Sequence, residues 1–487
     1  MSKKLRMLLS VLLMLTMVMA CGNSLAAKKP DELVIGFWTQ TGIPKDYQIL
    51  IRDCNCKIVD TVALNIGSYR DQLTLILSGG EHLDAFFANG NNFSTYVTRG
   101  QVIELDELLA EYGQDVVRVV GEEFLEAGKV GGVQYGITTI RDLAALRGPI
   151  FLADVLDQAG VDYSNFSWRN SITYDELHDI LVKIRDNTDM VPLVPTGANY
   201  KAYDMMGDHD MLGDSFGVLM HKGQESTTVV NMFATQEYMD FCKMMRQWYT
   251  EGLIMQDAVT NQESWGDLLR GGRGASFFSN LKPGYDLKCS AQVGKRIISV
   301  PVITAFTTTN IVQTGQWCIA RNSECPEAAM KFINKLFSDE ELINLLAWGI
   351  EGEHYQIIDQ EKRIIDYPEG VNVDNIGYNL NLGWVFGNQF ADYIWNGDSP
   401  DLWVETDEFN HSAPKSLAFG FNYDALPVKT EVAAVTNVCN EYRVSLEYGA
   451  VDPEIVIPEF LEKLKAAGID KIIAEKQRQL DAFLANK

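Results

Sequence analysis

The sequence predicts an α/β protein of two or three domains, and three observations lead to that prediction. A strand, a helix and a second strand alternate early in the chain, an order typical of a parallel sheet covered by helices. A length of 487 residues is too great for one hydrophobic core. No long repeat or low-complexity linker marks a boundary, as expected for a chain that crosses between two lobes more than once.

The N-terminus is predicted to be a targeting signal. Residues 1–20 read as a lipoprotein signal peptide, in which a basic segment precedes an apolar stretch over 7–19 that is too short to span a membrane. Ala20-Cys21 resembles a lipobox, whose cysteine receives a diacylglycerol. The alternative is an ordinary secretory signal cleaved near Ala27. We expect residues 21–30 to be a tether and lipid on Cys21 to hold the protein at the outer face of the cytoplasmic membrane.

The elements of the first third of the chain follow from short apolar runs. Strands are expected at 32–38, 61–66 and 83–88, and apolar side chains at helical spacing predict helices that begin near Tyr69 and Ile103. Gly131-Gly132 is expected at the tip of a hairpin that leads into a further strand.

Later helices are marked by their caps. Thr173 and Glu176 form a predicted capping box, Gly252 ends a helix that begins near Glu237, and Pro326 occupies a first helical turn. A second helix is expected to follow a cap at 338–341. Aromatic- and Asn-rich loops are expected over 349–420, and a final helix over 458–483 with a break at Gly468.

Composition restricts the partners. The chain has 66 acidic and 41 basic residues and a net charge of −25 at pH 7, which argues against nucleic acid and anionic lipid surfaces. The seven cysteines other than Cys21 contain no C-x-x-C pair, and most are expected to be buried without an assignable disulfide. His209, between two aspartates, is expected in a surface loop rather than at a metal. No metal or cofactor is predicted.

Catalytic motifs do not stand out. The sequence has no Gly-x-Ser-x-Gly, and the glycine-rich segment 271–274 lacks the Lys-Ser/Thr of a P-loop. Carboxylates are abundant, so a pair suited to glycoside hydrolysis is not excluded by counting. We expect that the protein is not an enzyme.

Three segments resemble motifs of the extracellular solute-binding proteins (family one) of ABC-type sugar importers. They are G-K-V-G-G-V-Q-Y-G-I at 128–137, W-Y-T-E-G-L-I at 248–254 and C-P-E-A-A-M-K-F-I at 325–333. Two further segments, W-G-I-E-G-E-H-Y at 348–355 and G-F-N-Y-D-A-L-P-V-K at 420–429, are similar to blocks of a Firmicute lipoprotein group. That group also carries a C-terminal module of unassigned activity, which 465–480 resembles.

The resemblance implies a two-lobed periplasmic-binding-protein-like fold (type II), in which each lobe is a mixed sheet flanked by helices and a multi-strand hinge joins them. Lobe 1 is expected to comprise 31–141 and 302–345, and lobe 2 to comprise 142–301 and 346–487, with 418–487 as the C-terminal module. The implied function is capture of an oligosaccharide in the interlobe cleft and its delivery to the permease subunits, without a chemical step.

In such lobes the cleft lies at the carboxyl ends of strands, and this rule selects the candidate ligand-binding residues. They are Trp38, Gln40, Asp84, Asn89, Arg141, Trp317, Glu351, Trp384 and Asn388. For each Trp the alternative is a ring in the core, for Asp84 a cap at a strand end, and for Glu351 a part of the hinge scaffold.

Two other functions stay open at this point. A surface glycoside hydrolase or lyase would need two carboxylates roughly 5 to 10 Å apart in the cleft. A ligand-sensing lipoprotein would use the same closed cleft as an importer, so the sequence does not separate these two.

Overall fold

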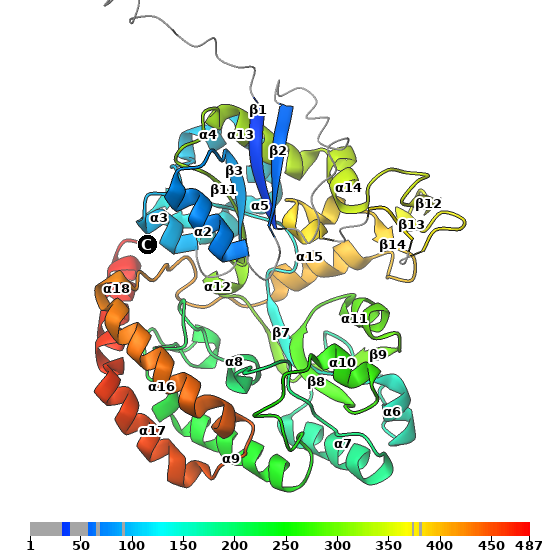
Figure 1. Cartoon of the computed structure of the whole chain (residues 1–487), viewed down its shortest axis with the longest axis vertical. Coiled ribbons are helices and arrows are strands. Elements are labelled where there is room, and N and C mark those ends of the chain that lie inside the picture. The colour runs from blue at the N-terminus through cyan, green and yellow to red at the C-terminus, as the bar shows by residue number, and fades with distance from the viewer. Residues whose placement is uncertain (1–31, 39–56, 65–68, 90–92, 373–374, 379–381) are drawn as a thin grey trace, which may run out of the picture.

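The computed structural model describes residues 32–38, 57–64, 69–89, 93–372, 375–378 and 382–487, which form two lobes with a core in each (Figure 1). The upper-lobe core includes Leu33 and Phe386, and the lower-lobe core includes Ala144 and Leu480. Core residues belong to the upper lobe over 33–143, to the lower lobe over 144–300, to the upper lobe again over 312–386, and, apart from Phe419, to the lower lobe over 409–480. The described part of the chain therefore crosses between the lobes three times. The expected α/β fold with two lobes and several crossings is confirmed.

The upper lobe is built on a five-stranded sheet of order β2-β1-β3-β11-β6. β1 (Glu32–Trp38) pairs in parallel with β2 (Lys57–Leu64) and β3 (Ala85–Asn89), and α2 (Tyr69–Gly79) connects the last two, so the predicted βαβ order is confirmed. β11 (Gly315–Ile319) pairs antiparallel with β3 and with β6 (Ile137–Thr138). β11 therefore returns to this sheet after the chain has built most of the lower lobe.

Helices cover both faces of this sheet (Figure 1). The predicted start near Ile103 lies three residues early, since α4 spans Asp106–Tyr112. Pro326 occupies the first turn of α13 (Pro326–Ser338), as predicted, and the Asp339 side chain accepts from Leu342 N at 3.1 Å to cap α14 (Glu340–Trp348). Further helices of the upper lobe include α3 (Phe93–Thr98), α5 (Gln114–Leu125) and the short α12 (Thr309–Val312).

The lower lobe is built around β7 (Ala145–Leu152), whose eight residues are all buried. β8 (Ser276–Leu281), β9 (Ile297–Ser299) and β10 (Ile303–Phe306) all pair antiparallel with it. The helices around this sheet are α6 (Ala153–Gln158), α7 (Tyr174–Asn187), α8 (Ala202–Met206), α9 (Gln236–Thr250), α10 (Trp265–Arg270) and α11 (Tyr285–Val293).

The predicted helix signals of this lobe are confirmed. Thr173 and Glu176 form both bonds of the capping box of α7, and the Gly252 backbone has φ +75° just after α9. A positive φ is costly for residues with a Cβ, so glycine suits this helix end.

Of the three C-terminal helices, two pack against α9 and the last packs on those two (Figure 1). α16 (Lys429–Glu447) and α17 (Pro453–Ala467) contact α9, and α18 (Ile469–Ala485) contacts α16 and α17. The break predicted at Gly468 is confirmed, because this residue separates α17 from α18 with φ +98°. The predicted start at Pro458 lies five residues late, and α16 was not predicted.

The segment after α14 packs on the upper lobe, whereas it was expected in lobe 2. Residues 346–487 were all expected in lobe 2, but Trp348, Tyr355, Ile365 and Val385 belong to the upper-lobe core. The reason is local: only Asp339 separates α14 from α13, so the chain leaves α14 on the upper lobe. This segment forms a small sheet of β12 (Gln356–Asp359), β13 (Ile364–Asp366) and β14 (Ile394–Trp395).

The three crossings lie side by side and are hydrogen-bonded to one another. Asn410, near the end of α15 (Leu402–Ser412), accepts from Leu143 N and donates to Arg141 O, both at 2.6 Å. Thr307, after β10, donates its hydroxyl to Leu143 O at 3.1 Å and its backbone N–H to Pro414 O at 3.0 Å. These bonds make the crossings a single three-segment hinge.

Candidate ligand-binding site

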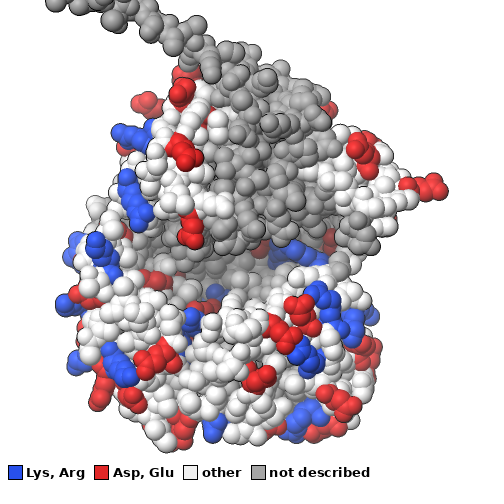
Figure 2. Space-filling view, viewed as in Figure 1, with Lys and Arg blue, Asp and Glu red and all other residues white. Residues whose placement is uncertain are grey.

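A cavity of about 290 Å³ lies where the two lobes face each other. Figure 2 shows the surface hollowed between the lobes. The lower lobe contributes the turn between β8 and α11, including Lys282 and Gly284, and the upper lobe contributes residues from the segment after α14. Six aromatic side chains line the cavity, namely Trp348, Tyr367, Trp384, Tyr393, Trp395 and Trp403.

Neighbouring rings fix the orientation of these aromatic side chains. Trp395 lies 5.4 Å from Trp348, and Tyr367 meets Trp395 edge-on at 4.7 Å between ring centroids. Trp384 meets Phe87 of β3 edge-on at 5.7 Å. Apart from the buried Trp348, the lining aromatic residues are partly exposed, so part of each is accessible.

A salt bridge lies at the lower wall of the cavity. Lys282 Nζ lies 2.7 Å from Asp142 Oδ1, and both side chains are about one quarter exposed. Burial opposes the charged form of Asp142, but Lys282 and Arg141 hold the pKa of this carboxyl below its usual range. Across the cavity, burial raises the pKa of Asp398 to about 6, although the charge of Lys282 opposes the rise. The cavity therefore carries charges of both signs.

Asp392 is a carboxyl group of a different kind. It is 1% exposed, and its Oδ1 has no hydrogen-bond partner among the described residues. Burial raises the pKa of Asp392 well above its usual range, against the opposing charge of Arg363, so the neutral acid is favoured. A neutral acid both donates and accepts hydrogen bonds, as a sugar hydroxyl does.

Glycine at position 383 makes room for this carboxyl group. A Cβ at Gly383 would overlap Asp392 Oδ2, so any other residue at this position would displace the carboxyl group. The Trp403 indole donates to Asp392 O at 2.9 Å, and Asn344 bonds to the residues on either side of Asp392, at 3.0 Å to Ala391 O and 2.7 Å to Tyr393 N. Asp392 is therefore held firmly in place.

Of the nine candidate residues, Trp384 lines this cavity. Trp317 is fully buried, and its indole donates to Val385 O at 2.9 Å. It is therefore a ring in the core, which was the alternative to ligand binding. Asp84 is fully buried as well and accepts from Val34 N at 2.9 Å and from Ser323 Oγ at 2.7 Å. It therefore caps a strand end, which was the alternative to ligand binding.

Three further candidates lie outside the cavity lining. Arg141 is 5% exposed and belongs to the hinge, where it donates to Ile311 O at 2.8 Å. Asn388 accepts from Phe390 N at 3.1 Å and caps a short 3₁₀ turn. Glu351 is exposed and pairs by its backbone with Tyr355, consistent with the scaffold alternative.

The remaining candidates fall at or beyond the limits of the description. Trp38 and Asn89 are the last residues of β1 and β3, and their side chains are outside the described part. Gln40 and the lipidation candidate Cys21 lie outside the described residues.

Sequence reasoning missed most of the cavity. Lys282, Asp392, Trp395 and Trp403 were not selected. Lys282 directly follows β8 and Trp395 ends β14, but the sequence does not show which strand ends face the cavity. One signal was available, namely the density of Trp and Tyr next to carboxylates between 384 and 403.

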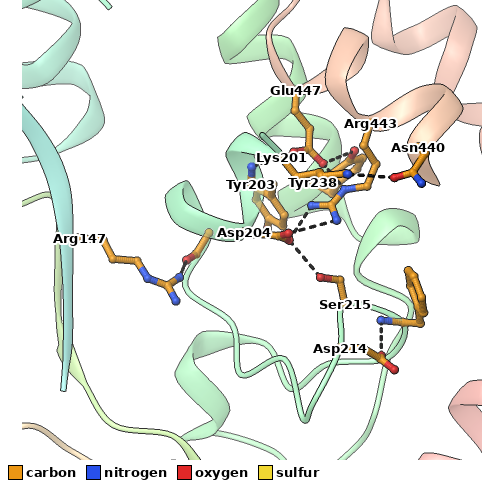
Figure 3. A network of polar contacts seen from close by, with 12 residues as sticks. Arg147, Lys201, Tyr203, Asp204, Asp214, Ser215, Tyr238, Asn440, Arg443 and Glu447 are labelled. Carbon is orange, nitrogen blue, oxygen red and sulfur yellow. Dashed lines mark hydrogen bonds and ion pairs between the residues drawn. The ribbon is translucent and has the colours of Figure 1, made fainter. Parts of the chain in front are cut away.

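The C-terminal helices are anchored to the lower lobe by buried charges (Figure 3). Arg443 of α16 lies 2.6 Å from Glu447 Oε1 and 2.6 Å from Asp204 Oδ1 on α8. Glu447 also accepts from Tyr203 N at 2.9 Å and from Tyr238 Oη at 3.2 Å. The module is thus part of the lower-lobe core and not an appended domain.

His209 lies near this cluster and contradicts its expected place in a surface loop. It is 1% exposed and stacks on Tyr203 at 5.2 Å, since the loop folds back under α8. Burial lowers the pKa of His209 to about 3, with Asp204 opposing, so the ring stays neutral at pH 7.

No helix in the described part of the chain is long and apolar enough to cross a membrane.

Comparison with known proteins agrees with the fold and the motifs. Residues 417–485 match the domain of unknown function DUF3502. The chain is 26% identical over 485 residues to a carbohydrate ABC transporter substrate-binding protein of Streptococcus pneumoniae serotype 4, covering 96% of this chain and 95% of the relative. It is 24% identical to lipoprotein LipO of Bacillus subtilis over 60% of each chain.

A solved structure extends the comparison. The N-glycan transport solute-binding protein NgtS of S. pneumoniae superposes with a TM-score of 0.82 at 23% identity, covering 94% of this chain and all of that one. NgtS has also been solved in complex with Man1GlcNAc and with Man5GlcNAc. The chain therefore has the fold of type II solute-binding proteins, carries the DUF3502 domain and matches a carbohydrate ABC transporter substrate-binding protein over nearly its whole length, as its motifs predicted.

Proposed function

We propose that this protein is the lipid-anchored substrate-binding component of an ABC-type carbohydrate importer and that it holds an oligosaccharide between its lobes. The observation that carries the proposal is the cavity itself. Six aromatic side chains and several hydrogen-bonding groups converge on it from both lobes. Aromatic rings cover the apolar faces of sugars, and mixed donors and acceptors match hydroxyl groups, which do both.

The relatives support a sugar as the ligand. The pneumococcal relative is named for carbohydrate transport, and NgtS was crystallised with glycans that contain mannose and N-acetylglucosamine. A neutral sugar is compatible with the cavity, because Lys282 is already paired with Asp142 and Asp392 favours the neutral acid.

The mechanism is capture followed by closure, with no bond made or broken. Ligand that contacts both walls binds the closed form better than the open form and shifts the population toward it. The three hinge segments allow this motion while their mutual hydrogen bonds keep the lobes in register. The permease then receives the sugar from the closed form.

The membrane anchor is proposed from the N-terminal sequence. The lipobox-like Ala20-Cys21 and the match to a B. subtilis lipoprotein both support lipidation of Cys21. Metabolic labelling with a palmitate analogue tests it: label is expected on the wild type and not on Cys21→Ser.

A thermal-shift panel on the chain without residues 1–21 tests the sugar-binding role. The panel holds neutral oligosaccharides, uronic acid oligosaccharides, peptides and metal ions. A ligand of the native state at one hundred times its Kd stabilises by about 2.7 kcal/mol. A shift with a saccharide that is recovered unchanged after overnight incubation supports the proposal. A shift with peptides or metals alone, or conversion of the sugar, contradicts it.

A further inference from the structure

The small sheet β12–β14 places an aromatic pair at the outer end of the cavity. It lies at the side of the upper lobe, next to α15 and above α11 (Figure 1). Trp395 ends β14, and Tyr367 directly follows β13. Both side chains line the cavity and meet edge-on at 4.7 Å.

This pair is held rigidly by its sheet. Ile365 of β13 pairs in parallel with Trp395 and is fully buried in the upper-lobe core. Asn396, which follows Trp395, donates its backbone N–H to Ile365 O at 2.8 Å and its side-chain amide N–H to Asp366 Oδ2 at 2.7 Å. The aromatic surface is therefore formed before any ligand arrives, and polar groups lie beside it.

The aromatic side chains form a wall that runs outward from the upper lobe. At its inner end Trp384 contacts Phe87 of the central sheet, and at its outer end Tyr367 and Trp395 belong to the peripheral sheet. The enclosed volume of about 290 Å³ lies at the lower end of the roughly 300–1,000 Å³ of pockets that enclose a small ligand. A longer saccharide that lies along this wall reaches Tyr367 and Trp395.

We propose that Tyr367 and Trp395 form a distal subsite that selects oligosaccharides by length. The two rings stack on a sugar unit that is present in a long oligosaccharide and absent from a short one. This inference rests on the proposed sugar-binding function. An aromatic contact of this kind corresponds to about a tenfold gain in affinity. The protein is therefore expected to bind a long oligosaccharide at least about tenfold more tightly than its short homologue.

Calorimetric titration of the purified chain tests this inference with matched short and long ligands. The pairs are Man1GlcNAc with Man5GlcNAc, maltose with maltopentaose, and an alginate disaccharide with its pentasaccharide. The quantity of interest is the ratio of the two Kd values within a pair. Trp395→Ala and Tyr367→Ala are expected to reduce this ratio about tenfold. Trp384→Ala, at the inner end, is expected to weaken both members of a pair and leave the ratio near its wild-type value.

The outcomes separate this inference from the function on which it rests. Equal affinity of the wild type for short and long members overturns the length subsite while sugar binding stands, and so does a ratio that neither outer variant changes. Failure of the wild type to bind any of the six saccharides contradicts the proposed function itself. Melting temperatures of the three variants, compared with the wild type, show that a lost ratio does not reflect unfolding.

Discussion

Replacing Arg443 with Met removes the positive charge from a cluster buried between α16 and the lower lobe. Arg443 is 3% exposed and contacts Glu447, which is fully buried, and Asp204, which is 26% exposed, both at 2.6 Å. Methionine fills a similar volume but leaves two carboxylates without their cation. Truncating one partner of a buried ion pair costs about 3–5 kcal/mol, because the remaining charge stays buried without compensation.

The change is large enough to measure as a shift of the melting temperature. For a folding unit of the size of the lower lobe, the loss corresponds to a decrease of roughly 6 °C or more. Differential scanning calorimetry of wild type and Arg443→Met measures it directly. The matched control is Lys243→Met, which removes an exposed ion pair with Glu454 between α9 and α17. The control is expected to have a much smaller effect, since water and salt screen exposed pairs.

The pair of variants decides whether the cluster anchors the C-terminal helices. A melting temperature of Arg443→Met equal to that of Lys243→Met would refute the reasoning. The double variant Arg443→Met/Glu447→Met adds a further check, because removing the stranded carboxylate is expected to recover part of the lost stability.

Three other predictions follow from the cavity, the hinge and the buried histidine. Gly383→Ala should weaken saccharide binding at least about tenfold in calorimetric titration, because its Cβ displaces the Asp392 carboxyl group, whereas Gly197→Ala, whose Cβ meets open space, should not; equal affinities would contradict this. Asn410→Ala should lower the free energy of unfolding in urea by about 1–3 kcal/mol, because two buried backbone groups of the first crossing lose their partner, and an unchanged value would exclude the proposed clamp. Burial depresses the pKa of His209 to about 3, so below pH 6.5 the unfolded chain binds a proton that the folded chain does not. The free energy of unfolding therefore decreases as the pH is lowered from 6.5 to 3. Between pH 7 and 5 the wild type should therefore lose about 2 kcal/mol more than His209→Phe in urea titrations, and identical losses would show that this ring does not control the difference.

Helix ends were predictable from the sequence because their signals are local. The capping box at Thr173 and the left-handed glycine at Gly468 act within one turn of the backbone, so a few residues specify them. α16 was missed for a physical reason: it buries Arg443 and Glu447, which interrupts the apolar pattern that marks a helix facing a core.

The site was less predictable, because it depends on which face of an element the rest of the chain covers. Trp317 and Trp384 were equivalent candidates in the sequence. β11 is an inner strand of the upper sheet, and the Trp317 ring is fully buried, whereas Trp384 lies in a short 3₁₀ turn and lines the cavity. Lys282 and Asp398 face each other only after folding has brought residues more than one hundred positions apart to the same cavity.

Hydrogen–deuterium exchange with and without an oligosaccharide from the panel tests the central claim most directly. If the sugar is held between the lobes, protection should appear together on 382–403 of the upper lobe and on 282–293 of the lower lobe, and mass spectrometry should recover the sugar unchanged. Protection of one wall alone, protection elsewhere on the molecule, or a converted sugar would contradict capture between two closing lobes.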